Sequence, residues 1–131
     1  MIKAELFRLL NGFDPDFFMF YEEVDLCRRA LNKGFKVLYY PKLKIHHIGS
    51  ISGKKDYTLY TIRTYASKNI YVSKHFKSVY LIIMRVLLYL QLFSQLFIWL
   101  LLFPFNNKKA TQKIKAFIYL IKNNLKYEHR D

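Results

Sequence analysis

Residues 11–49 read NGFDPDFFMFYEEVDLCRRALNKGFKVLYYPKLKIHHIG and carry most of the structural signals in the chain. Three acidic residues open a helical pattern that basic residues close, and Gly34 follows it. Acids near the start of a helix and bases near its end complement the helix dipole, and glycine suits the left-handed position after the last turn. The sequence therefore predicts a helix over about residues 22–33, with an inner face of Val24, Cys27, Ala30 and Leu31.

Two short alternating patterns follow this helix and are separated by Pro41. They consist of Phe35, Val37 and Tyr39, then Leu43, Ile45 and His47. Successive side chains of a strand point to opposite faces of a sheet, so alternation of this kind is typical of strands. We expect a small strand pair over about residues 35–48, with His46 and His47 on opposite faces of the second strand.

The acidic cluster and the histidine pair each have an ordinary structural explanation. Glu22, Glu23 and Asp25 can simply form a solvated cap at the positive end of a helix. His46 and His47 can be one buried and one exposed histidine of the same strand. Neither motif by itself indicates a catalytic site.

Taken together and in order, these motifs resemble the acceptor-side half of family-2 glycosyltransferases, especially the bacterial rhamnosyltransferase-like branch. Members of that group have the GT-A fold and carry the pattern GGFDE-x-FF-x-Y-x-ED-x-DLC-x-R, followed by spaced G, P, H and G-x-S positions. The matching residues here are Asn11–Asp14, Phe17-Phe18, Tyr21–Cys27, Arg29, Gly34, Tyr40-Pro41, His46-His47 and Gly49-Ser50. The resemblance implies an α/β fold: an incomplete GT-A half of short helices and a small strand pair.

The resemblance also implies roles for individual residues. Inverting glycosyl transfer needs a base for the acceptor hydroxyl, and positive charge, usually a divalent metal, for the departing nucleoside diphosphate. The base falls on Glu23, where the family usually has Asp. Glu22 and Asp25 complete the catalytic group, with Asp25 bracing the helix start, and His47 joins the metal and diphosphate site.

The donor-binding half of such an enzyme has no counterpart in these 131 residues. No paired acids precede Asn11, and the four glycines of the chain form no phosphate-cradling loop. We therefore interpret residues 1–56 as the C-terminal part of a catalytic domain, inactive alone. A Mg²⁺ or Mn²⁺ ion, the nucleotide-sugar donor and a glycan or lipid-linked acceptor belong to the complete enzyme, whose nucleotide-binding half a separate chain could supply.

Residues 57–131 form a second region that is helical, basic and apolar. The run Val86–Phe103 has eighteen residues without a formal charge, and an apolar segment precedes it. About twenty apolar residues span a bilayer, so residues 79–103 could cross a membrane, although Gln91, Ser94 and Gln95 interrupt the run. Residues 108–127 follow as an amphipathic helix. Basic residues on both sides of the apolar run favour a helix lying on the membrane over one spanning it.

Charge is concentrated in this second region. The net charge of the chain is +13, and fourteen Lys and Arg against three Asp and Glu lie from Ile51 onward. We expect an anionic membrane surface as partner, at the cytoplasmic face of the cell membrane, with the chain peripheral or single-span. Nucleic-acid binding, which the charge of +13 and the many aromatic residues suggest, ranks last among the functions, and we expect no nucleic-acid partner, because the basic residues border an apolar helix and no RNA-binding motif is present. The alternative function is a non-catalytic membrane-surface module or a degenerate fragment of such an enzyme.

Overall fold

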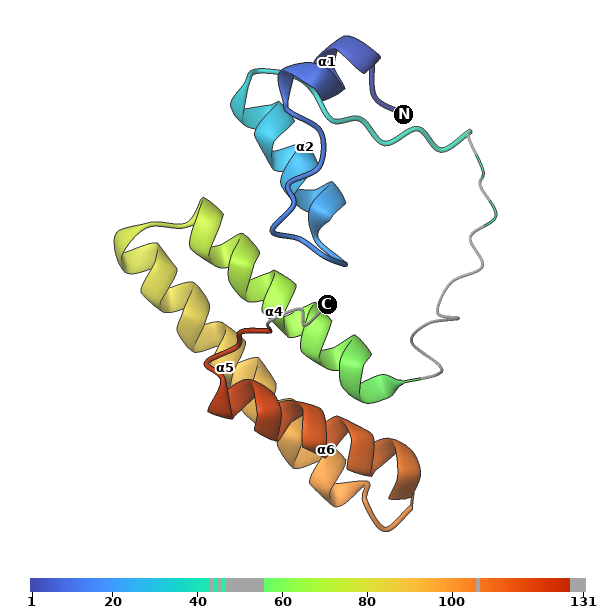
Figure 1. The fold of residues 1–131 in the computed structure, drawn as a ribbon, viewed down its shortest axis with the longest axis vertical. Helices are drawn as coiled ribbons and strands as arrows, with labels where there is room; N and C mark the ends of the chain where they lie inside the picture. Colours follow the sequence, from blue (N-terminus) through green and yellow to red (C-terminus); the bar gives the residue numbers. More distant parts are fainter. Residues whose placement is uncertain (43, 45, 47–55, 106, 128–131) are drawn as a thin grey trace. The chain divides into compact units, whose positions relative to one another are not determined.

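The computed structural model describes residues 1–42, 44, 46, 56–105 and 107–127, and these residues form helices joined by turns and coil (Figure 1). The helices are α1 (Ala4–Leu9), α2 (Glu22–Asn32), α4 (Tyr57–His75), α5 (Ser78–Leu101) and α6 (Asn107–Lys122). The chain divides into two compact units, unit 1 from Met1 to Gly49 and unit 2 from Ser50 to Asp131. The boundary predicted from the sequence lies between residues 56 and 57.

The α/β fold predicted from the sequence is wrong, because the part of the chain that the structure describes contains helices and no strand. Residues 35–40 are coil, and all of their apolar side chains are exposed. A strand is stable only where its backbone groups pair with a neighbouring strand, and no described segment pairs with this one. Leu43, Ile45 and His47 of the second predicted strand lie outside the described residues.

The helix predicted at the acidic cluster is confirmed as α2. It begins at Glu22 and ends at Asn32, and Gly34 follows with a φ of +82°, as expected for a residue just after a helix. Its buried residues, however, are Asp25, Leu26 and Ala30, whereas Val24 and Leu31 are exposed.

The predicted inner face is therefore wrong at every position except Ala30, and Cys27 does not fill the core but is exposed. The small core of unit 1 consists of Leu10, Leu26 and Ala30, with Leu6 and Phe7 of α1 packed against them.

Unit 2 contains the three helices expected after the first region. α4 and α5 are antiparallel: Lys68 Nζ donates to Gln91 Oε1 at 3.2 Å, and Arg85 Nη2 donates to Ser73 Oγ at 3.2 Å. α6 packs against both helices. It runs parallel to α4, since the hydroxyl of Thr58 donates to the carbonyl oxygen of Gln112 and Asn69 donates to that of Leu125 (Figure 1).

Asp56 caps the start of α4 by accepting hydrogen bonds from the backbone N–H groups of Thr58 and Leu59 at 2.8 and 3.1 Å. The core of unit 2 draws residues from all three helices and from the turn after α6: Ile62, Tyr65, Val72, Leu88, Leu92, Ala116, Phe117, Leu120 and Leu125.

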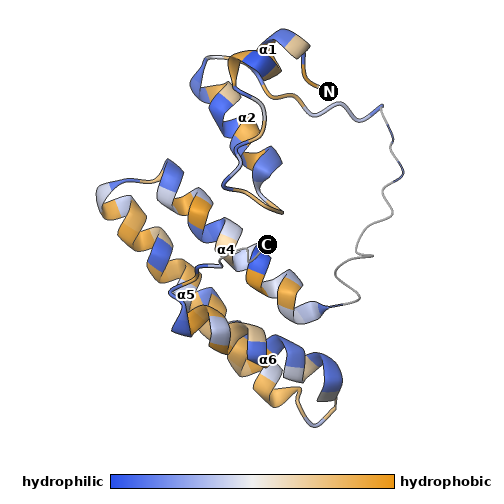
Figure 2. Ribbon diagram, viewed as in Figure 1, coloured by the Kyte–Doolittle hydropathy of each residue, from blue (hydrophilic) through white to orange (hydrophobic). Residues whose placement is uncertain are grey.

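Helix α5 is long and apolar enough to cross a membrane. It has 24 residues, which at 1.5 Å per residue is about 36 Å. Figure 2 shows it as the most continuously apolar helix of unit 2, whereas α4 and α6 alternate between polar and apolar residues. Only 11% of its apolar eighteen-residue stretch is buried, because α4 and α6 cover one side of the helix.

Candidate functional site

Asp25, one of the three predicted catalytic carboxylates, takes part in an internal ion pair. Its side chain is 1% exposed, and its Oδ2 accepts a hydrogen bond from Arg29 Nε at 2.7 Å. The two residues are four positions apart on α2, so they share one face of the helix. A carboxylate so deeply buried requires such a charged partner, and Arg29 supplies it.

The same guanidinium joins α2 to the turn after α1. Arg29 Nη1 donates to the carbonyl oxygen of Leu10, and Nη2 donates to that of Gly12 at 2.8 Å. Gly12 has a φ of +67°, and a Cβ there would meet the ring of Phe7 at 3.3 Å. The Asp25–Arg29 pair therefore fixes the position of the loop that leads into α2. Sequence reasoning missed this role of Arg29, although the i, i+4 spacing of an acid and a base was its signal.

Glu22 and Glu23 occupy two further environments at the same helix start. Glu23 is exposed, whereas Glu22 is half-buried and its Oε2 is buried with no hydrogen-bond partner among the described residues. The backbone immediately before them is unusual, since Phe20 and Tyr21 both have a φ of +70°. Such left-handed conformations are costly for non-glycine residues and cluster at functional sites.

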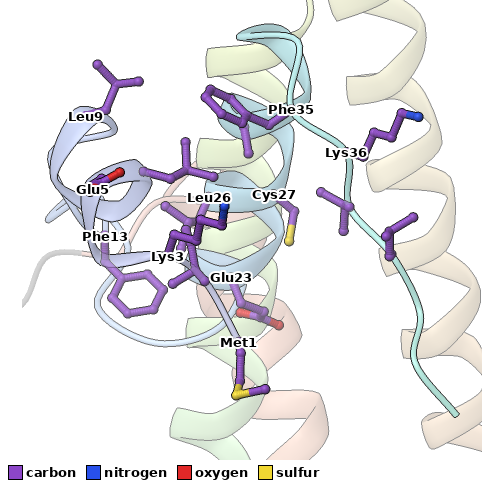
Figure 3. A pocket seen from close by; sticks show the side chains of 15 residues that line it. Met1, Lys3, Glu5, Leu9, Phe13, Glu23, Leu26, Cys27, Phe35 and Lys36 are labelled. Atoms are coloured by element: carbon purple, nitrogen blue, oxygen red, sulfur yellow. The ribbon is translucent and has the colours of Figure 1, made fainter. Parts of the chain in front are cut away.

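Glu23 also lines a pocket of unit 1 with a volume of about 910 Å³ (Figure 3). The pocket lies among the N-terminal residues, α1, α2 and residues 35–38, and its lining is mainly apolar, including Leu6, Leu9, Leu26 and Phe35. Lys3, Glu5, Glu23, Cys27 and Lys36 also belong to its lining. A carboxylate at the edge of an apolar hollow can accept a proton from the hydroxyl of a bound molecule.

The structure brings the three predicted carboxylates together in the first turn of α2, but it gives them different surroundings. His47, the predicted metal ligand, lies outside the described residues. Within the residues that the structure does describe, no group of three His, Cys, Asp or Glu side chains is arranged to hold a metal ion.

A second cluster, of lysines and aromatic rings, joins the three helices of unit 2. Lys113 Nζ donates to Thr61 Oγ1 at 2.6 Å and lies 5.9 Å from the centre of the Tyr57 ring. Lys109 Nζ lies 5.0 Å from the same ring and 5.5 Å from that of Trp99. Burial, and to a smaller extent the charge of Lys109, lowers the pKa of Lys113 below its usual 10.5. Cation–π contacts thus fasten the start of α6 to α4 and α5.

Comparisons of this chain with protein-family models, with curated proteins and with solved structures gave no match.

Proposed function

We propose that the chain is a segment of a glycosyltransferase. In the complete enzyme it transfers a sugar from a nucleotide-sugar donor to a glycan or lipid-linked acceptor at the cytoplasmic face of the cell membrane, in the synthesis of cell-surface polysaccharide. The observation that carries the proposal is the contrast between two carboxylates of one helix turn. Asp25 is buried and paired with Arg29, whereas Glu23 is exposed at a pocket.

This contrast supports a division of labour within the acidic motif. A general base has to reach the hydroxyl whose proton it removes, so it must be accessible to the acceptor. Glu23 meets that requirement, and Asp25 acts as a positioning residue that holds Arg29 and the preceding loop. Glu22 lies next to the base, with one carboxylate oxygen buried.

The leaving nucleoside diphosphate requires groups beyond those described. We assign His47 to the metal and diphosphate site of the complete enzyme, where a Mg²⁺ or Mn²⁺ ion stabilises the departing charge. The nucleotide-binding half is supplied outside these 131 residues, for example by a separate chain. The purified 131-residue chain is accordingly inactive alone, and sugar transfer by it with added metal would contradict this proposal.

The test is a set of substitutions made in the native gene, with sugar transfer measured in isolated membranes from labelled nucleotide sugar. Glu23→Gln keeps the size of the side chain but removes the base, so we expect turnover to fall about 100-fold or more with the amount of folded protein unchanged. Asp25→Asn instead lowers the amount of folded protein. Asp16→Asn, an exposed acid outside the pocket lining, is the control. A wild-type rate in the Glu23→Gln membranes would refute the assignment.

A non-catalytic membrane-surface module is the second candidate, and the exposed apolar side of α5 favours it. The same experiment separates the two functions. If the chain is only a membrane-surface module, sugar transfer in the membranes stays at the wild-type rate when Glu23 is replaced by Gln, because Glu23 then has no catalytic role.

A further inference from the structure

The exposed side of α5 forms a continuous apolar stripe. The stripe begins with an adjacent pair, continues at every third or fourth position, and has residues between 49% and 64% exposed: Ile82, Ile83, Val86, Leu90, Phe93 and Phe97. This spacing places them along one side of a helix. The opposite side carries Leu88 and Leu92, which are buried in the core of unit 2. Ser94 is exposed, and its hydroxyl donates to the backbone oxygen of Gln91 at 2.9 Å, which satisfies its hydrogen-bond donor within the helix.

An exposed apolar surface of this length marks a contact with lipid or with another protein. The positive charge of unit 2 favours lipid over a second copy of the chain as the partner of this surface. From Ile51 onward the chain has fourteen Lys and Arg against three Asp and Glu. Two copies of unit 2 joined through their stripes would bring these like charges together, whereas an anionic bilayer attracts them. The lipid surface is therefore the complementary partner.

The packing of unit 2 also decides the orientation of α5. Gln91 is near the middle of the helix, and Lys68 of α4 binds it, while Arg85 binds Ser73 of α4. An upright α5 would carry these cations toward the centre of the bilayer, where charged side chains are costly. To avoid this it would have to leave α4 and α6, which would expose Leu92 and Phe117, now 0% and 2% exposed.

We infer that α5 lies in the plane of an anionic membrane surface, with the stripe inserted into the lipid and with α4 and α6 on the water side. Unit 2 keeps its three-helix core in this arrangement, and none of α4, α5 and α6 crosses the bilayer. The inference rests on the membrane location proposed above, but it does not rest on sugar transfer.

The first experiment measures partition of the full chain onto sealed vesicles of equal parts phosphatidylcholine and phosphatidylglycerol, with pure phosphatidylcholine for comparison. Leu90→Lys removes an inserted side chain and places a charge in the lipid, so we expect partition to weaken at least about tenfold. Ile118→Lys, on the exposed side of α6, adds the same charge away from the lipid and should change partition by less than about twofold. Circular dichroism checks that both variants keep their helices, and Leu90→Gln provides a second, uncharged variant.

The second experiment determines whether both ends of α5 lie on one side of the bilayer. In a Cys27→Ser background, single cysteines at Lys77 and Lys108 are treated with a membrane-impermeant maleimide after the chain has bound to sealed vesicles from outside. An in-plane helix leaves both cysteines reactive. A spanning helix protects one of them until detergent is added.

Each result supports or overturns the inference. Tighter binding to anionic vesicles, loss of binding on Leu90→Lys and two reactive cysteines support it. Protection of one cysteine overturns the in-plane orientation alone. Absence of vesicle binding overturns both this inference and the proposed membrane location. A dimer in solution that Leu90→Lys dissociates, without vesicle binding, shows that a second copy covers the stripe. None of these results alters the Glu23→Gln test of sugar transfer.

Discussion

Removing Arg29 should unfold unit 1 locally, because one side chain satisfies three acceptors there. Arg29→Ala leaves the Asp25 carboxylate, which is 1% exposed, without its cation, and leaves the Leu10 and Gly12 carbonyls without their donor. Breaking a buried ion pair by removing one partner costs about 3–5 kcal/mol. Arg29 itself is 25% exposed, so water can reach part of the site, and we expect about 3 kcal/mol, the low end of that range. The core of unit 1 is small, so this is a large share of its stability.

Hydrogen exchange of the full chain, followed by mass spectrometry, measures this loss. A loss of about 3 kcal/mol lowers the protection of the α2 amides about 100-fold. Arg29→Lys keeps the charge but not the planar fork, so we expect a loss of about 1–2 kcal/mol. Arg28→Ala, at the exposed neighbouring position, is the control and should cost less than about 0.5 kcal/mol. If Arg29→Ala and Arg28→Ala had equal effects on the protection of α2, the reasoning would be refuted.

Three further predictions concern single contacts. Asp56→Ala removes the cap of α4 and should lower the unfolding free energy of unit 2 by about 1 kcal/mol, measured by urea unfolding; an unchanged midpoint would contradict the role of the cap. Gly12→Ala combines a positive φ with a close approach to the Phe7 ring and should cost about 1–2 kcal/mol, seen as faster exchange in α1. Lys109→Gln removes the smaller cause of the lowered pKa of Lys113, so that pKa should rise part of the way toward 10.5 in an NMR titration. Because folded Lys113 loses its proton at lower pH than the unfolded chain does, stability rises with pH just below 10.5, and Lys109→Gln should flatten that rise.

Local signals in the sequence predicted the helices well. The acids, bases and glycine around α2 describe its two ends, because capping and dipole effects act within a few residues. The face that α2 buries could not be predicted in the same way. A pattern of apolar residues predicts that Asp25 is exposed. Asp25 is buried because it pairs with Arg29, and Arg29 in turn binds the carbonyl oxygens of Leu10 and Gly12, which are distant in the sequence.

The prediction of a strand pair was wrong for a different reason. Alternation in Phe35, Val37 and Tyr39 shows that a segment suits a sheet, but a strand also needs a partner, and partners come from distant parts of a chain or from another chain. For α5, eighteen uncharged residues were enough to predict a helix that is long and apolar enough to cross a membrane. The same composition could not show which side α4 and α6 cover, because nearly every position is apolar.

For the candidate site, the sequence predicted that three carboxylates lie close together, but it did not predict which of them is buried and which is exposed. Adjacent positions in one helix turn necessarily bring Glu22, Glu23 and Asp25 together. Whether each is buried, paired or presented to a pocket depends on α1 and on residues 35–38, which no local pattern positions.

The parallel arrangement of α4 and α6 has a consequence for how the protein is made. The inner side of α5 is covered partly by Phe117, Leu120 and Leu125, all of which are synthesised after the whole of α5. At about 5–20 residues per second, about one to five seconds separate the synthesis of Leu101 from that of Leu125. Until these three residues have been made and have left the ribosome, they cannot cover the inner side of α5, so the three-helix core of unit 2 stays open. Closure of this core is therefore expected to be a late step of folding, which waits for α6 and the turn after it.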